Sequence, residues 1–136
     1  MEYTDLYING TWSKGTSGER FDVINPATEE VLASVASADI ADADAALDAA
    51  EAAMKDWAAR TPRQRSEVLR KAWELMTARL DEFAHLITLE NGKARADALG
   101  EATYAAEFFR WFAEEAVRAD GMITHAPASG ARIVVQ

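Results

Sequence analysis

The apolar residues of this chain change their spacing along the sequence, and the change predicts strands first and helices afterwards. Up to residue 36 they occur in short runs between turn residues, which is typical of β-strands. Asn9 and Gly10 separate two such runs and predict a β-hairpin, because both residue types accept the positive φ of a tight turn. Two further strands are expected at residues 21–24 and 31–35.

Beyond these strands, an apolar spacing of three or four residues predicts three long helices. The first covers residues 40–59 and is capped by Asp39. The second begins with a capping box at Thr61 and continues through residues 62–91. The third covers about residues 95–120. The apolar stripe of the second helix consists of Leu69, Ala72, Met76, Leu80, Phe83 and Ile87.

The third predicted helix carries apolar residues on two adjacent faces. One stripe consists of Ala102, Ala105, Phe109, Phe112 and Ala116. The other consists of Tyr104, Phe108 and Trp111. A surface helix normally buries a single stripe, and nothing downstream in the 136 residues is available to cover the second. We therefore expect the chain to be the front piece of a larger enzyme.

Residues 122–136 predict two strands joined across Ser129 and Gly130. The sequence shows no internal repeat and no low-complexity linker.

The chain is acidic, with a formal net charge of -9, and its hydrophobic content of 49% is sufficient for a core. Nucleic-acid binding is not expected, because it requires Lys and Arg to neutralise phosphates. Much of the acidity lies on the first helix, where a solvated face is the simpler interpretation and an acidic docking surface the alternative. These acids are Asp39, Asp42, Asp44, Asp48, Glu51 and Asp56.

The sequence contains no cysteine, which removes disulfides, thiolate metal ligands and a thiolate nucleophile. Its first residues lack a basic region followed by an apolar one, and no apolar run is long enough for a membrane span. We therefore expect a cytoplasmic protein with no membrane partner.

Catalytic groups are scarce. His85 falls opposite the apolar stripe of the second helix, which predicts a solvated position, and His125 has no metal-ligating partner at a useful spacing. The glycine-containing segment 15–18 is too short for a phosphate-binding loop and leads into a strand. Taken alone, these residues contain no active site.

Five segments nevertheless follow one another in a distinctive order. They are YINGTW at 7–12, FDVINPAT at 21–28, Trp57 ahead of an arginine-rich helix start, LITLENGK at 86–93 and GEATYAAEFFRWFAEEA at 100–116. Together they resemble the opening of NAD(P)-dependent aldehyde dehydrogenases, most closely the succinate-semialdehyde dehydrogenase branch, over essentially the whole chain. Two positions depart from the family pattern: Glu29 stands where a turn glycine is usual, and Ala94 stands where proline is common.

The resemblance implies an α/β fold, of which this chain would contain short N-terminal β-hairpin strands, three long α-helices and a C-terminal β-strand pair. Residues 1–121 would be the N-terminal part of the cofactor-binding domain, and residues 122–136 the start of the oligomerisation strand pair. The implied activity is oxidation of an aldehyde, succinate semialdehyde or a similar one, with NAD or NADP. The family's cysteine nucleophile, glutamate base and cofactor loop would lie beyond residue 136. The fragment alone would therefore be inactive and bind no nicotinamide cofactor.

The resemblance also implies a structural Na+ or K+ site. In many members the cation lies between backbone carbonyls before the Asn-Pro turn and an acidic residue before Asn-Gly-Lys. The matching positions here are Val23, Ile24 and Glu90. Oxygen ligands suit a hard cation, and at least one further ligand would come from outside the 136 residues. The alternative is that Glu90 is only an acidic residue near a helix C-terminus.

A second implied site lies on the third helix, which lines the substrate entrance in the family. Tyr104 occupies the matching position and Phe108 follows one turn later. The alternative interpretation is that this aromatic pair, four residues apart, is core packing.

The partners implied are the remainder of the same enzyme and, once complete, further copies in a dimer or tetramer. Two other interpretations stay open: a non-catalytic subunit of a split enzyme, and a helical protein-binding module that has lost catalysis. The uncovered aromatic residues argue against the module, because each exposed one forfeits roughly 1.5–3 kcal/mol of burial energy. The total stability of a domain is only about 5–15 kcal/mol.

Overall fold

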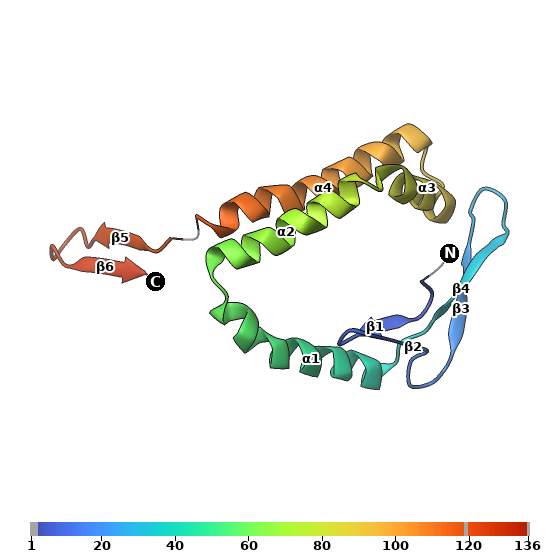
Figure 1. The fold of residues 1–136 in the computed structure, drawn as a ribbon, viewed down its shortest axis with the longest axis horizontal. Helices are drawn as coiled ribbons and strands as arrows, with labels where there is room; N and C mark the ends of the chain where they lie inside the picture. The colour runs from blue at the N-terminus through green and yellow to red at the C-terminus, as the bar shows by residue number, and fades with distance from the viewer. Residues whose placement is uncertain (1–2, 119, 136) are drawn as a thin grey trace.

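The computed structural model describes residues 3–118 and 120–135, which form four helices and three two-stranded antiparallel sheets (Figure 1). The strands of the N-terminal region are β1 (Leu6–Ile8), β2 (Thr11–Ser13), β3 (Arg20–Ile24) and β4 (Val31–Ala36). The helices are α1 (Ile40–Ala59), α2 (Pro62–Thr77), α3 (Leu80–Asn91) and α4 (Arg95–Ala116). The last two strands are β5 (Met122–His125) and β6 (Arg132–Val135). The α/β composition predicted for the fragment is confirmed.

The predicted N-terminal hairpin is confirmed. β1 and β2 pair antiparallel with Tyr7 opposite Trp12, and their rings lie 4.8 Å apart. Asn9 and Gly10 form the turn with φ values of 49° and 78°. The two residue types in the turn therefore explain its position, because both accept this backbone conformation.

β3 and β4 form the second sheet close to the predicted bounds, with a register shift between Val23 and Ile24. In the turn between these strands Glu29 has a φ of 62°. This is the position where a glycine is usual in the family that the sequence resembles. Glycine adopts a positive φ without steric strain, whereas a residue with a Cβ atom does not.

Helix α1 has the predicted bounds, and its N-terminus is closed by a capping box. The Asp39 side chain accepts a hydrogen bond from the Asp42 amide at 3.1 Å, and the Asp42 side chain accepts one from the Asp39 amide at 3.0 Å. Within the helix Asp42 alone is buried, at 6% exposure, and Ala49 is half-buried. The expectation of a solvated acidic face is therefore wrong for Asp42.

The helix predicted at residues 62–91 is in fact two helices, so the fragment has four long helices and not three. The break lies at Ala78 and Arg79, where the Arg79 backbone leaves helical geometry, with φ of -122° and ψ of 20°, and its amide donates to the carbonyl of Met76. Neither Gly nor Pro marks this break. Its cause is tertiary: the turn allows α3 to pack across the beginning of α4 while α2 runs along it (Figure 1).

The core of the described region lies where α4 meets α2 and α3. Its buried apolar residues are mainly alanines, and small side chains allow the helix axes to approach closely. They are Ala84 of α3 and Ala98, Ala102, Ala106 and Ala113 of α4. The predicted stripe is thus only partly buried, since Phe109 and Phe112 are 37% and 53% exposed. α4 ends at Ala116, before the predicted end near residue 120.

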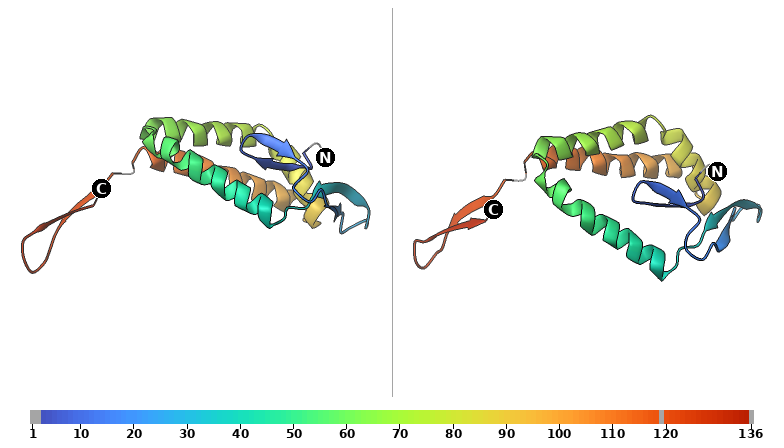
Figure 2. Two further views of the ribbon diagram at one scale, coloured as in Figure 1. Left: turned by 90° about the horizontal axis from the view of Figure 1, so that it is seen from below. Right: turned by 60° about the horizontal axis from the view of Figure 1, so that its bottom comes forward.

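The last two strands form a hairpin that projects from the end of α4, away from the other elements (Figure 2). All eight of its strand residues are exposed. Its pairing across Ser129 and Gly130 agrees with the prediction, while Gln136 lies outside the described residues. Of the helices in the described part of the chain, none is long and apolar enough to cross a membrane.

Candidate functional site

The aromatic residues of α4 form an exposed surface, which we call the aromatic face. It consists of Tyr104, Phe108, Trp111 and Phe112. The Tyr104 and Phe108 rings meet edge to face with centroids 4.9 Å apart, and the Phe108 and Phe112 rings stack at 6.5 Å. With Glu107 the face borders a hollow of about 360 Å³. Tyr104 and Trp111 remain 66% and 59% exposed.

This placement bears on the two interpretations of Tyr104 and Phe108, and their role at the substrate entrance stays a prediction. Tyr104 is mostly exposed, while Phe108 is about half covered and borders a small hollow with Leu69 of α2. The exposed parts of both rings are available to contact a ligand or a protein segment outside the described region. An apolar surface of this kind suits an aliphatic ligand chain or another protein segment.

The carboxylate that borders the hollow of about 360 Å³ is held by a cation. Glu107 accepts a hydrogen bond from Nε of Arg110 at 2.7 Å. The Arg110 guanidinium thereby lowers the pKa of the Glu107 carboxyl below its ordinary value. A carboxylate stabilised in its ionised form is a weak proton acceptor, so Glu107 is a poor general base.

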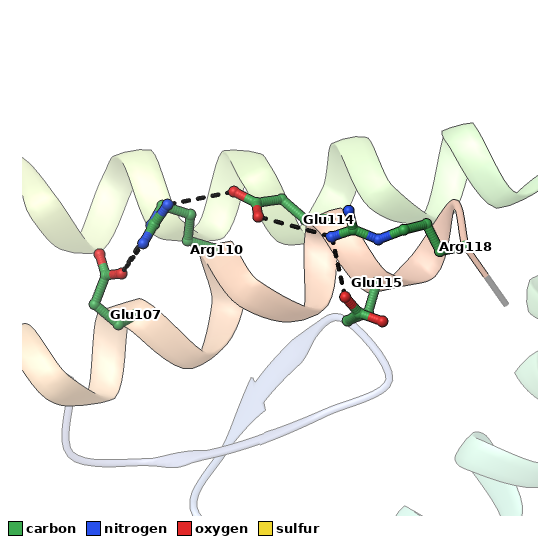
Figure 3. Close-up of polar contacts among 5 residues, drawn as sticks. All are labelled: Glu107, Arg110, Glu114, Glu115 and Arg118. Atoms are coloured by element: carbon green, nitrogen blue, oxygen red, sulfur yellow. Dashed lines mark hydrogen bonds and ion pairs between the residues drawn. The ribbon is translucent and has the colours of Figure 1, made fainter.

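The same arginine begins a row of ion pairs along α4 (Figure 3). Arg110 also pairs with Glu114 at 3.3 Å, and Arg118 pairs with Glu115 at 3.0 Å and with Glu114 at 3.9 Å. All these pairs join residues three or four apart in the sequence, and Arg118 lies just beyond the end of α4. They are solvent-exposed pairs of the kind that stabilise a helix modestly.

The two segments that carry the predicted cation ligands meet through a contact that the sequence does not reveal. A Cβ atom placed on Gly92 would lie 3.0 Å from Cγ of Pro26, so the end of α3 touches the Asn-Pro turn that follows β3. Glu90 is exposed in the last turn of α3. The register shift between Val23 and Ile24 disturbs the strand ladder at the predicted carbonyls. These features fit a cation with oxygen ligands, and its binding stays a prediction.

The two histidines are exposed. His85 lies on the solvent side of α3, as predicted, and His125 lies in β5 opposite Arg132. Within the described residues no group of three or more His, Cys, Asp or Glu side chains could hold a metal ion. The segment 15–18 leads into β3 and not into a helix, as predicted.

One polar cluster in the structure is not predicted by the sequence. The Asp42 carboxylate accepts hydrogen bonds from the Thr16 amide at 2.9 Å and from the Thr16 hydroxyl at 2.8 Å. The capping-box spacing of Asp39 and Asp42 was a signal for one half of this arrangement. No residue pattern near Asp42 predicts the contact with Thr16, which lies 26 residues earlier in the sequence.

Comparison with known proteins identifies relatives for nearly the whole chain. Residues 12–136 match the model of the aldehyde dehydrogenase family. The chain is 45% identical over 115 residues to succinate-semialdehyde dehydrogenase [NADP(+)] of Saccharomyces cerevisiae, covering 85% of this chain and 23% of that protein. It is 45% identical over 115 residues to glutarate-semialdehyde dehydrogenase of Pseudomonas putida, covering 85% of this chain and 24% of that protein.

Solved structures also match nearly the whole chain. An Escherichia coli NADP-dependent enzyme superposes with a TM-score of 0.89 at 40% identity, covering 96% of this chain and 27% of that one. PnpE in complex with nicotinamide adenine dinucleotide superposes with a TM-score of 0.86 at 28% identity, covering 93% of this chain and 26% of that one. The chain spans about a quarter of the length of the curated relatives that it matches.

Proposed function

This chain belongs to the aldehyde dehydrogenase family, and from that premise we propose that it is the N-terminal portion of an enzyme that oxidises an aldehyde to the acid with NAD(P)+. The observation that carries the proposal is the amount of surface that the described fold leaves open. Its solvent-accessible surface is 10119 Å² for 14.9 kDa. A compact monomer of this mass exposes about 7,000 Å².

The difference of about 3,000 Å² lies on this chain alone, and it is at least as large as one side of a large obligate interface, which buries roughly 2,000–5,000 Å² on the two partners together. Much of the open surface is apolar, including the aromatic face and the outward residues Leu47 and Met54 of α1. Such faces favour association. They suit a chain whose helices are covered by the remainder of the same enzyme better than they suit an autonomous binding module.

We propose a semialdehyde carrying a distal carboxylate as the substrate, because the relatives include succinate- and glutarate-semialdehyde dehydrogenases. The chain has no cysteine, so the nucleophile would come from the remainder of the enzyme. Expression of the complete reading frame, followed by assay of NAD(P)H formation with succinate semialdehyde and with an uncharged aldehyde, tests both points. Activity only with the uncharged aldehyde would overturn the substrate, and no activity with either would overturn the function.

Within that enzyme we propose that Tyr104 and Phe108 line the substrate entrance. Their exposed, mutually packed rings would exclude water and contact the aldehyde chain. Tyr104→Ala in the complete enzyme should raise KM for the aldehyde severalfold and leave KM for the cofactor unchanged. Tyr7→Ala, which removes an exposed tyrosine from the hairpin, is the matched control. Equal kinetics for the two variants would contradict the assignment.

We also propose that the carbonyls of Val23 and Ile24 and the carboxylate of Glu90 contribute to a Na+ or K+ site. The contact between Gly92 and Pro26 and the register shift in β3 support it. In the complete enzyme, replacing choline by sodium or potassium chloride should raise the Tm. Glu90→Ala should remove that increase, while Asp48→Ala on α1 should keep it. A Tm that does not respond to either cation would refute the site.

We propose that residues 1–121 belong to a cofactor-binding domain and that residues 122–136 take part in a dimer or tetramer of a cytoplasmic enzyme. The exposed apolar residues of the projecting β5–β6 hairpin support the second part. Ile123→Lys with Val134→Lys should convert the complete enzyme to a smaller species in sedimentation experiments. An unchanged sedimentation coefficient would place the subunit contact elsewhere.

A further inference from the structure

The N-terminal strands are joined to the helices at a buried carboxylate on α1. Asp42 has 6% exposure, although it lies in the first turn of a helix whose other residues are almost all exposed. Its Oδ1 accepts hydrogen bonds from the amide and the hydroxyl of Thr16, and its Oδ2 accepts one from the Asp39 amide. The carboxylate thus satisfies donors from two segments that are far apart in the sequence.

The loop around Thr16 is fitted closely to this carboxylate. Gly15 has a φ of 80°, and a Cβ atom built on it would lie 3.2 Å from Oδ2 of Asp42. The same atom would lie 3.2 Å from the carbonyl oxygen of Ser37 and 3.3 Å from Cδ1 of Leu6. Glycine is therefore required by the backbone conformation and by the space, and four segments converge at this point.

Few other contacts join the strand region to α1. Beyond Asp42, the helix packs only lightly, on β1, and its remaining length is open. The strands themselves are joined by backbone bonds such as that from the Ala36 amide to the carbonyl of Thr4 at 2.8 Å. These bonds organise the strands but do not connect them to the helix.

We propose that Asp42 is a latch that fastens the loop between β2 and β3 to the N-terminus of α1 and thereby holds the strand region against that helix. The carboxylate is the only side-chain group placed to accept from both Thr16 and Asp39 among the hydrogen bonds of the described residues. Its loss would release the loop while the packing of α2, α3 and α4 stays intact. This inference is independent of the proposed substrate and cofactor.

The test is hydrogen exchange of the intact protein carrying Asp42→Asn. The variant keeps the shape of the side chain, but one oxygen becomes an NH2 group that faces N–H or O–H donors. We expect exchange at the Thr16 or the Asp39 amide to become about tenfold faster or more. Amides of β1 and β2 should also exchange faster, whereas those of α2 and α4 should not change.

Two further variants keep the proposal falsifiable. Asp44→Asn makes the same change at an exposed position on the same helix and should leave exchange at Thr16 and Asp39 unaltered. Thr16→Val removes only the hydroxyl donor and should give a smaller acceleration at the loop, even if Asp42→Asn fails to fold. Unchanged exchange at both amides in Asp42→Asn and Thr16→Val would overturn the latch, and so would an equal acceleration of all amides in the protein.

Discussion

The two faces of α4 differ in the size of their side chains and in what covers them. One face consists of alanines that are at most 5% exposed and lie against α2 and α3. The other carries Tyr104, Phe108, Trp111 and Phe112, which are between 47% and 66% exposed. The large apolar side chains would release more free energy on burial, yet the described fold buries the small ones. The alanine face is therefore the contact made within this fragment, and the aromatic face is suited to a contact made beyond it.

The largest effect is expected when an alanine of the covered face of α4 is replaced by a larger residue. Ala106→Leu inserts three extra carbon atoms at a position that is 2% exposed. Overpacking of this kind should lower the free energy of unfolding by about 1–3 kcal/mol, measured by urea denaturation. The control is Ala46→Leu on the open part of α1, where we expect a change within about 0.5 kcal/mol. Similar values for the two variants would show that the alanine face is not a packed interface.

The aromatic face should instead govern association. In the 136-residue chain, replacing Tyr104, Phe108 and Trp111 together by alanine should reduce concentration-dependent self-association, because it removes a contiguous apolar surface. Analytical ultracentrifugation across a concentration series measures the effect. Tyr7→Ala with Trp12→Ala, which removes exposed aromatic residues from the hairpin, is the matched control and should change association less. Equal association of all three proteins would contradict the role of the face.

A smaller effect is expected from acid, which should weaken the contribution of Asp42 to the free energy of unfolding. Hydrogen bonds from the Asp39 amide and then from Thr16 lower the pKa of Asp42 below its ordinary value. The folded state therefore binds this proton less readily than the unfolded state, and Asp42 contributes stability above its unfolded pKa of about 3.9. That contribution is lost as the pH falls through the lower folded value.

In urea titrations the parent protein should lose stability below about pH 4 more steeply than Asp42→Asn, which lacks this carboxylate. Glu67, Glu82 and Glu107 also have lowered pKa values, each because an arginine side chain donates a hydrogen bond to it. These pairs are exposed and screened by salt. Raising the ionic strength should therefore reduce their part of the acid response in both proteins. Parallel pH curves for the parent and Asp42→Asn would contradict the assignment to Asp42.

The features that the sequence predicted correctly depend on neighbouring residues. The Asn9-Gly10 turn, the caps at Asp39 and Thr61 and the end of α3 at Gly92 each follow from residue types within a few positions. A turn or a cap is decided by local backbone conformation and local hydrogen bonds. Such features can be read from one sequence without knowing what packs against them.

The features that it missed depend on segments far apart. The break at Ala78 and Arg79 has no local marker, because arginine and alanine are both good helix formers. The apolar spacing of residues 69–87 continues through the break, and only the position of α4 shows why the chain turns there. In the same way, periodicity showed two apolar stripes on α4 but not which alanines would be buried. The burial of Asp42 cannot be predicted from its neighbours in the sequence, because its partner Thr16 is 26 residues away.

The nearly complete exposure of α1 has a consequence for how substitutions in it should behave. A 20-residue helix spans about 30 Å, and α1 reaches that length with only Asp42 buried. Half of its residues are alanine, the best helix former, so its backbone conformation is supported by intrinsic preference more than by tertiary contacts. The stability of α1 in this chain should therefore depend on helix propensity, as it does in an isolated peptide. Glycine substitutions along its open middle should therefore have nearly equal and additive effects, whichever face they occupy.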